Sequence, residues 1–186
     1  MQGFSGTNDG QYLFPLHITQ RDPDHQRGTN AKVLSYLLQS ENGHYMCMAR
    51  EDGERRNTRE FLELLTSQRP EIRVLLDVGA QMLELRNYQL AQTWLNISSD
   101  ASAAVYFNDD DELTVLTRDG NTQLLVSSPF AQQLDQCVVY LDDAHTRGTD
   151  LKLPSGFRAA VTLGPRVTKD RLAQGVYIFR HFDPRS

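Results

Sequence analysis

The sequence predicts a single α/β domain with a mostly parallel sheet and an inserted β-hairpin. Three observations support this prediction. Short apolar runs rich in β-branched residues alternate with segments whose apolar residues recur at helical spacing. The chain has 186 residues, which suits one domain with a sizeable core. Two β-like runs in the middle of the chain are separated by Asp119-Gly120, a strong hairpin signal.

The first part of the chain predicts an arm followed by helices. Residues 1–28 are rich in Gly, Asp, Asn, Gln and Pro, so we expect an irregular N-terminal arm. Asn30 can cap a helix over residues 31–39, and residues 45–49 are predicted to form a strand. A second helix begins at the capping-box-like pair Asn57 and Glu60 and ends before Pro70.

Strands dominate the next part of the chain. A strand over residues 73–77 turns at Gly79, and a helix is expected over residues 87–95. The four acids of residues 109–112 are most simply a solvated turn between strands. The remaining predicted elements are strands 103–107, 113–117 and 123–126, a short helix 130–135, strands 138–141 and 159–163, and a helix 168–174 ended by Gly175.

Composition limits the classes of function. The formal charge of −5 gives no electrostatic case for nucleic-acid binding. Apolar runs are too short to span a bilayer, and the N-terminus lacks a signal-peptide hydrophobic region, so we expect no membrane association. The chain has two cysteines, Cys47 and Cys137, too few for a disulfide framework, so we expect a reducing intracellular setting, cytoplasmic or nuclear. They form no Cys-x-x-Cys pair and no zinc pattern, and we expect no metal and no cofactor.

The loop after strand 138–141 is the strongest candidate for a functional site. Ligands bind beyond the carboxyl ends of strands in open α/β sheets, and five ionisable residues follow this strand. They are Asp142, Asp143, His145, Arg147 and Asp150. Because Asp77 follows another predicted strand, its carboxylate could orient His145. Alternatively, Asp77 caps the turn at Gly79 and His145 bonds a backbone carbonyl; the two interpretations are about equally supported.

The cysteines are less favourable candidates for chemistry. Cys137 and His145 suggest a thiol–imidazole pair, but eight extended residues at roughly 3.3 Å each would separate them by about 26 Å. Cys137 is therefore expected to be a small buried hydrophobe, and Cys47 on its predicted strand is expected to lie in the core. A pair of Cys47 with His145 stays open but has no motif behind it.

The segment from Arg147 to Asp150 combines an arginine suited to a phosphate or carboxylate with Gly148 and an acid that could order the arginine. The alternative is a tight turn with a structural Arg–Asp pair. No lysine of the chain follows a glycine, so a P-loop is absent from this sequence.

Several long blocks resemble the C-terminal part of very large fungal proteins generally labelled ubiquitin thioesterase or ubiquitinyl hydrolase. The resemblance covers nearly the whole chain up to Gly175. It implies a thiol-dependent deubiquitinase that acts on ubiquitin conjugates, with upstream domains of a larger parent protein as partners. Its blocks are Phe4-Ser-Gly-Thr-Asn-Asp9, Leu75-Leu-Asp-Val-Gly-Ala-Gln81, residues 139–154, residues 160–165 and residues 168–175.

In such an enzyme His145 would be the general base, Asp77 or Asp142 would orient it, and Cys137 would be the nominal nucleophile. A fragment that only binds, without activity, is a further alternative.

Shorter motifs are similar to late motifs of superfamily-two helicases and translocases. They are Ser5-Gly-Thr7, Arg147-Gly-Thr-Asp150 and the helix Asp170-Arg-Leu-x-Gln174. This resemblance implies a three-layer, RecA-like second lobe. Arg147, Gly148, Thr149 and Asp150 would then serve nucleotide contact and domain coupling, and the lobe with the P-loop would lie upstream in a longer protein.

The C-terminal end departs from both patterns. The large fungal proteins continue after Gly175 with a Cys-x-Arg-x-Arg-type segment, where a helicase carries phosphate-sensing arginines. Residues 176–186 of this chain have a different sequence, in which Arg180 could replace such an arginine. We therefore expect three parts: an arm over 1–28, an α/β domain over 29–175 and a divergent tail over 176–186.

Overall fold

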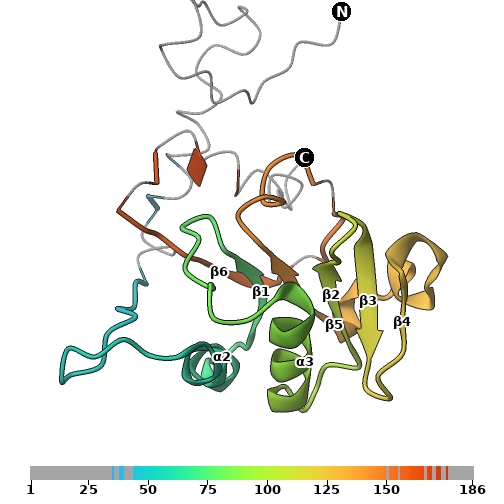
Figure 1. Cartoon of the computed structure of the whole chain (residues 1–186), viewed down its shortest axis with the longest axis horizontal. Coiled ribbons are helices and arrows are strands. Elements are labelled where there is room, and N and C mark those ends of the chain that lie inside the picture. The colour runs from blue at the N-terminus through green and yellow to red at the C-terminus, as the bar shows by residue number, and fades with distance from the viewer. Residues whose placement is uncertain are drawn as a thin grey trace, which may run out of the picture.

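The computed structural model describes residues 44–149, 151–154 and 156–165, together with residues 35, 38–39, 167–168, 171–172 and 175. Six strands form one mixed sheet in the order β4-β3-β2-β5-β1-β6 (Figure 1). The elements are α2 (Thr58–Ser67), β1 (Ile72–Leu76), α3 (Asn87–Ile97), β2 (Ala103–Phe107), β3 (Leu113–Thr117), β4 (Thr122–Leu124), β5 (Cys137–Leu141) and β6 (Arg158–Val161).

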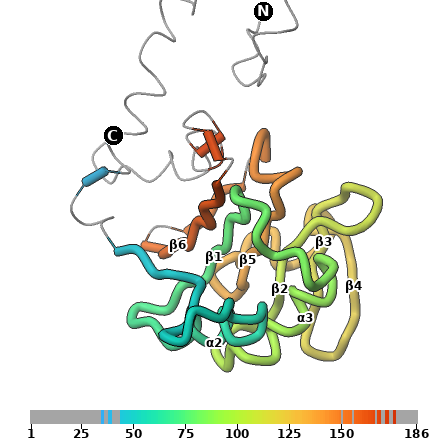
Figure 2. The backbone as a smooth tube through the Cα atoms, turned by 60° about the vertical axis from the view of Figure 1, so that its left-hand side comes forward, coloured from blue at the N-terminus to red at the C-terminus, as the bar shows by residue number. Residues whose placement is uncertain are grey.

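Four neighbouring strands of the sheet are parallel, which confirms the predicted α/β class and mostly parallel sheet. β5 pairs with β2 on one side and with β1 on the other, and β1 pairs with β6. Figure 2 shows the strands side by side in this order. The antiparallel strands β3 and β4 extend the sheet beyond β2, and Gly120 at φ 84° turns the chain between them. The Asp119-Gly120 hairpin is thus confirmed.

β1 and β5 are adjacent interior strands of the sheet, and both of their faces are covered. Every residue of β5 is buried, which suits its continuous apolar run. Alternate side chains enter two separate clusters: Leu75 and Val138 pack with the helices, whereas Val74 and Val139 pack on the opposite face.

α2 begins at the capping box that its sequence predicts. The Asn57 side chain accepts from the backbone N–H of Glu60 at 2.9 Å, and the Asn57 N–H donates to the Glu60 carboxylate at 3.1 Å. Such reciprocal bonds satisfy two N–H groups that a helix start leaves unpaired. The helix buries Phe61, Leu62 and Leu65 and ends at Ser67, ahead of Pro70.

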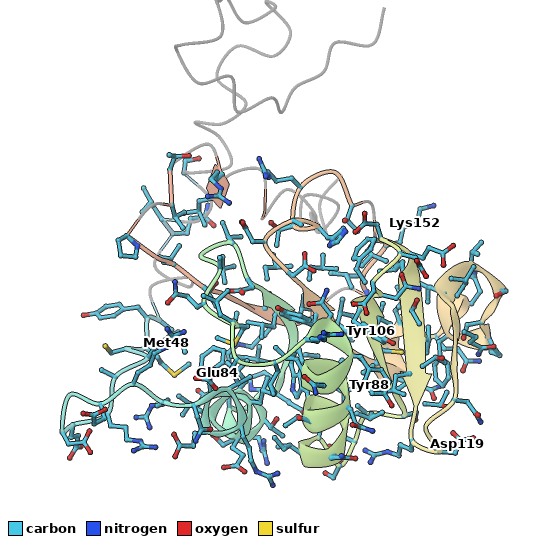
Figure 3. The ribbon with its side chains drawn as sticks, in the orientation of Figure 1. Met48, Glu84, Tyr88, Tyr106, Asp119 and Lys152 are labelled. Atoms are coloured by element: carbon cyan, nitrogen blue, oxygen red, sulfur yellow. The ribbon has the colours of Figure 1, made fainter. Side chains whose placement is uncertain are left out.

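α3 covers the same face of the sheet and packs over β2 and β5. It buries Leu90 and Trp94, both with no exposed surface, and these side chains share a cluster with the apolar side of α2. At the N-terminal end of α3, the rings of Tyr88 and Tyr106 meet edge to face with centroids 6.1 Å apart (Figure 3). The predicted helix over residues 87–95 is confirmed.

In the described part of the chain, short 3₁₀ turns and a loop cover the opposite face of the sheet. The turns span Leu125–Ser127, Pro129–Gln132 and Leu134–Gln136, and the loop contributes Leu151 and Leu153. The single helix predicted over residues 130–135 is therefore wrong in type. Gln133 adopts φ −133° and ψ 40°, which breaks the helical path between the last two turns.

The predicted strand over residues 45–49 is wrong. Only one isolated bridge, between Ala49 and Arg55, forms there, and Tyr45 is 94% exposed. Cys47 is exposed as well, so the expected core role does not hold. No strand of the described sheet pairs with this segment, and β-propensity alone does not hold a strand together.

Several predicted segments lie wholly or largely outside the described residues: the arm 1–28, the helices 31–39 and 168–174, and the tail 176–186. None of the helices in the described part has the length and apolar character needed to cross a bilayer.

Leu90→Ala tests the core between α3 and the sheet. We expect a loss of about 2–5 kcal/mol in the free energy of unfolding, because a fully buried side chain leaves a cavity. Urea denaturation measures it. Leu83→Ala is the matched control, since Leu83 is 78% exposed and should cost no more than about 0.5 kcal/mol. Equal losses for both variants would contradict this packing.

Candidate functional site at the carboxyl edge of the sheet

The carboxyl ends of β1, β5 and β2 bring polar residues from distant parts of the chain to one edge of the sheet. Asp77 follows β1, Asp142 follows β5, and Asn108 follows β2. The backbone N–H of Asp77 donates to the carbonyl of Leu141 at 2.8 Å, so the two exits remain adjacent. This is the edge at which an open α/β sheet binds ligands.

His145 lies at the centre of this edge, between two carboxylates. Its Nδ1 is 2.6 Å from Oδ1 of Asp142, and its Nε2 is 3.1 Å from Oδ1 of Asp111. The ring stacks on Phe107 with centroids 3.9 Å apart and planes at 7°. Asn87 completes the group, and we call these five residues the His145 cluster: Asn87, Phe107, Asp111, Asp142 and His145.

Asp142 is firmly oriented. Its Oδ1 also accepts from the backbone N–H of His145 at 3.0 Å, which closes a turn, and its Oδ2 accepts from Nδ2 of Asn87. Asn87 Nδ2 donates in addition to the carbonyl of Phe107 at 3.0 Å. Because an amide nitrogen carries two hydrogens, one side chain of α3 ties the exit of β5 to the exit of β2.

Asp77 does not contact His145; of the two expected orienters, only Asp142 reaches the ring. Asp77 is 2% exposed and accepts from the N–H groups of Gln81 (2.7 Å) and Met82 (2.9 Å) and from the Thr162 hydroxyl (2.5 Å). Its oxygens therefore organise the turn of residues 77–82, which matches the turn-capping alternative.

Gly79 lets this turn pass close to the strand exit of β6. A Cβ at position 79 would lie 2.7 Å from the carbonyl carbon of Leu163, closer than real contacts allow. A shallow hollow of about 260 Å³ lies beside the turn and is lined by Val78, Gly79, Ala80, Gln81, Pro165, Val167 and Arg171. The Arg171 guanidinium also donates to the carboxylate of Asp143.

The segment 147–149 continues the loop of the His145 cluster. Gly148 adopts φ 80°, which glycine tolerates well, and has open space around it. The Thr149 hydroxyl donates to the carbonyl of His145, so it serves the turn. Arg147 is half-buried and has no ion-pair partner among the described residues. Asp150 lies outside the described residues.

Cys137 lies at the other end of β5, opposite the site. It is fully buried, and its Sγ contacts the carbonyl oxygen of Gln133 at 3.7 Å. Burial, aided by the negative charge of Asp135, raises the pKa of the Cys137 thiol to about 12. A thiol of this kind is not a thiolate near neutral pH, and no hydrogen bond joins it to a histidine of the described residues, so the structure does not bring Cys137 together with His145.

Three members of the His145 cluster escape sequence reasoning. From the sequence, Asn87 is predicted to be the first residue of a helix, Phe107 the end of a strand, and Asp111 one acid of a solvated turn. Only Asp111 carries a detectable backbone peculiarity, φ 58°, and that too requires the structure. In the described part of the chain, no group of three or more His, Cys, Asp or Glu side chains is placed to hold a metal ion.

Alkylation tests the assignment of the two thiols. At pH 8 a thiol with a pKa of about 12 is ionised in only about one molecule in ten thousand, so iodoacetamide should modify the exposed Cys47 and spare Cys137 in the folded chain. Mass spectrometry of peptides reads the site. Unfolding in urea is the control and should expose both thiols; equal labelling of both in the folded chain would contradict the buried position.

Comparison with protein-family models, with curated proteins and with solved structures finds no match to this chain.

Proposed function

We propose that this domain supplies the imidazole–carboxylate half of the active site of a thiol-dependent ubiquitinyl hydrolase, as one part of a larger protein. The observation that carries the proposal is the His145–Asp142 pair at the carboxyl edge of β5, with 2.6 Å between Nδ1 and Oδ1. The long-block resemblance to the large fungal ubiquitin thioesterase-like proteins supplies the reaction class and the partner, ubiquitin joined to another protein.

In this reaction Nδ1–H of neutral His145 donates a hydrogen bond to the Asp142 carboxylate, which leaves Nε2 with a free lone pair. Nε2 takes the proton of a cysteine thiol, and the thiolate attacks the carbonyl carbon at the C-terminus of ubiquitin. The amine leaves with a proton, and water hydrolyses the thioester. Asn87 keeps Asp142 in position for this work through its two hydrogen bonds.

The nucleophile in this proposal is not Cys137, because that thiol is buried at the amino end of β5 with a pKa of about 12. Two sources remain. Cys47 is exposed and is the other cysteine of this chain. A cysteine of an upstream domain of the parent protein is the second source, and the position of the His145 cluster at an accessible edge of the sheet suits it.

A ubiquitin probe with a thiol-reactive C-terminus tests the proposal on the full-length parent protein. We expect a covalent adduct whose rate falls at least about tenfold in His145→Ala, because general bases contribute roughly 100-fold or more. Cys137→Ser should react like the unaltered protein. Loss of the adduct in Cys47→Ala would identify Cys47 as the nucleophile, and an unchanged adduct would place the nucleophile in an upstream domain. Absence of any adduct, or an adduct insensitive to His145→Ala, would reject the function.

A second candidate is supported by a separate observation. Four parallel strands and a hollow lined by Arg171 at their carboxyl edge suit a RecA-like second lobe of an NTPase or translocase, with a P-loop lobe upstream. Arg147, which has no ion-pair partner among the described residues, would contact phosphate.

ATP turnover by the full-length parent tests this candidate. Arg147→Ala and Asp150→Ala should each lower the rate at least about tenfold, since Arg147 would stabilise the charge on the transferred phosphoryl group and Asp150 would order that arginine. Arg59→Ala, which removes an arginine from an exposed helical ion pair, is the matched control and should leave turnover unchanged. No turnover, or equal loss in all three variants, would exclude an NTPase lobe.

A further inference from the structure

His145 has a carboxylate at each ring nitrogen, and only the doubly protonated ring can donate to both carboxylates at once. Neutral imidazole carries one N–H and can donate to one acceptor, whereas imidazolium donates from both nitrogens. The distances of 2.6 Å to Asp142 and 3.1 Å to Asp111 are both hydrogen-bond distances between a ring nitrogen and an acid oxygen. The Phe107 ring stacked on the imidazole also favours the cation.

The two carboxylates differ in how firmly they are held. The Asp142 side chain is 21% exposed and has Asn87 and the His145 backbone as additional donors. The Asp111 side chain is 85% exposed and stands on the β2–β3 turn at φ 58°. In the described residues, the carboxylate of Asp111 has His145 as its hydrogen-bond partner. The contact to Asp111 is therefore the one that opens first.

We propose that Asp111 is a proton-controlled latch that occupies Nε2 of His145. The latch is closed while His145 is an imidazolium. When Nε2 loses its proton, its lone pair faces a carboxylate oxygen, the attraction is lost, and Asp111 turns to solvent. The open state has Nδ1–H on Asp142 and a free Nε2, which is the form of His145 that a general base needs. This consequence for activity rests on the proposed function; the latch itself does not.

Acidic side chains outnumber basic ones around the His145 ring. Beyond Asp142 and Asp111, the β2–β3 turn carries Asp110, Glu112 and Asp109, the last of which is 4.0 Å from Arg86. The loop of His145 carries Asp143, which is paired with Arg171, and the half-buried Arg147. Two of these acids, Asp142 and Asp111, contact the ring nitrogens, so the latch is closed with the doubly protonated ring and opens when Nε2 loses its proton.

The test of the latch is ¹⁵N NMR of the histidine rings in the whole 186-residue chain across a pH series. Unaltered His145 should show the doubly protonated ring over a pH range in which Asp111→Asn already shows the neutral Nδ1–H form. Asp110→Asn is the matched control: it removes the same charge from the same turn and should behave like the unaltered chain. Identical ring states in Asp111→Asn and Asp110→Asn would overturn the latch.

The consequence for activity is measured in the full-length parent with the thiol-reactive ubiquitin probe. Asp111→Asn should speed adduct formation by about two- to fivefold near neutral pH, the range expected for the loss of one exposed ion pair, and Asp110→Asn should not. If NMR shows the altered ring state in Asp111→Asn but the unaltered parent forms no adduct with the probe, the ubiquitinyl hydrolase function is rejected and the latch is retained. Adduct formation with no effect of Asp111→Asn at any pH would overturn the latch as a control of activity.

Discussion

The parallel pairing of β1 with β5 is the constraint on which the rest of the structure depends. Both strands are buried on both faces, so they need neighbouring strands on either side and cover above and below the sheet. Their parallel direction brings both carboxyl ends to one edge, and the hydrogen bond from Asp77 to Leu141 extends the pairing one residue beyond the strands. Two acids thus leave the sheet side by side.

These two acids have different roles because their surroundings differ. Asp77 is enclosed by its own turn, and each of its oxygens receives a donor from that turn or from Thr162. A buried carboxylate needs such donors, so Asp77 holds the backbone in place. Asp142 stays partly exposed and directs an oxygen at His145. The distinction explains why one acid is structural and the other available for chemistry.

The hairpin beyond β2 affects the site as well as the edge of the sheet. Its turn carries Asp111 to the ring of His145, and Phe107 at the end of β2 supplies the surface on which the ring stacks. A segment outside the parallel core therefore reaches the edge that carries the candidate site. This contact links the state of one histidine to the position of the turn, which is the physical basis of the proposed latch.

The sequence by itself determined the α/β class, the capped helix α2, the hairpin at Asp119-Gly120 and the loop that carries His145, because these follow from local periodicity, capping and turn chemistry. Tertiary structure alone decided that residues 45–49 form no strand and that Asp142 and not Asp77 meets His145. It also decided that Phe107 and Asp111 contact the His145 ring and that Asn87 holds Asp142. The contacts of His145 with Asp111 and Phe107 join residues 34 and 38 positions apart, and the contact of Asn87 with Asp142 joins residues 55 positions apart, so no local pattern records them. Long-range proximity is set by how the strands order themselves in the sheet, which is a property of the whole core.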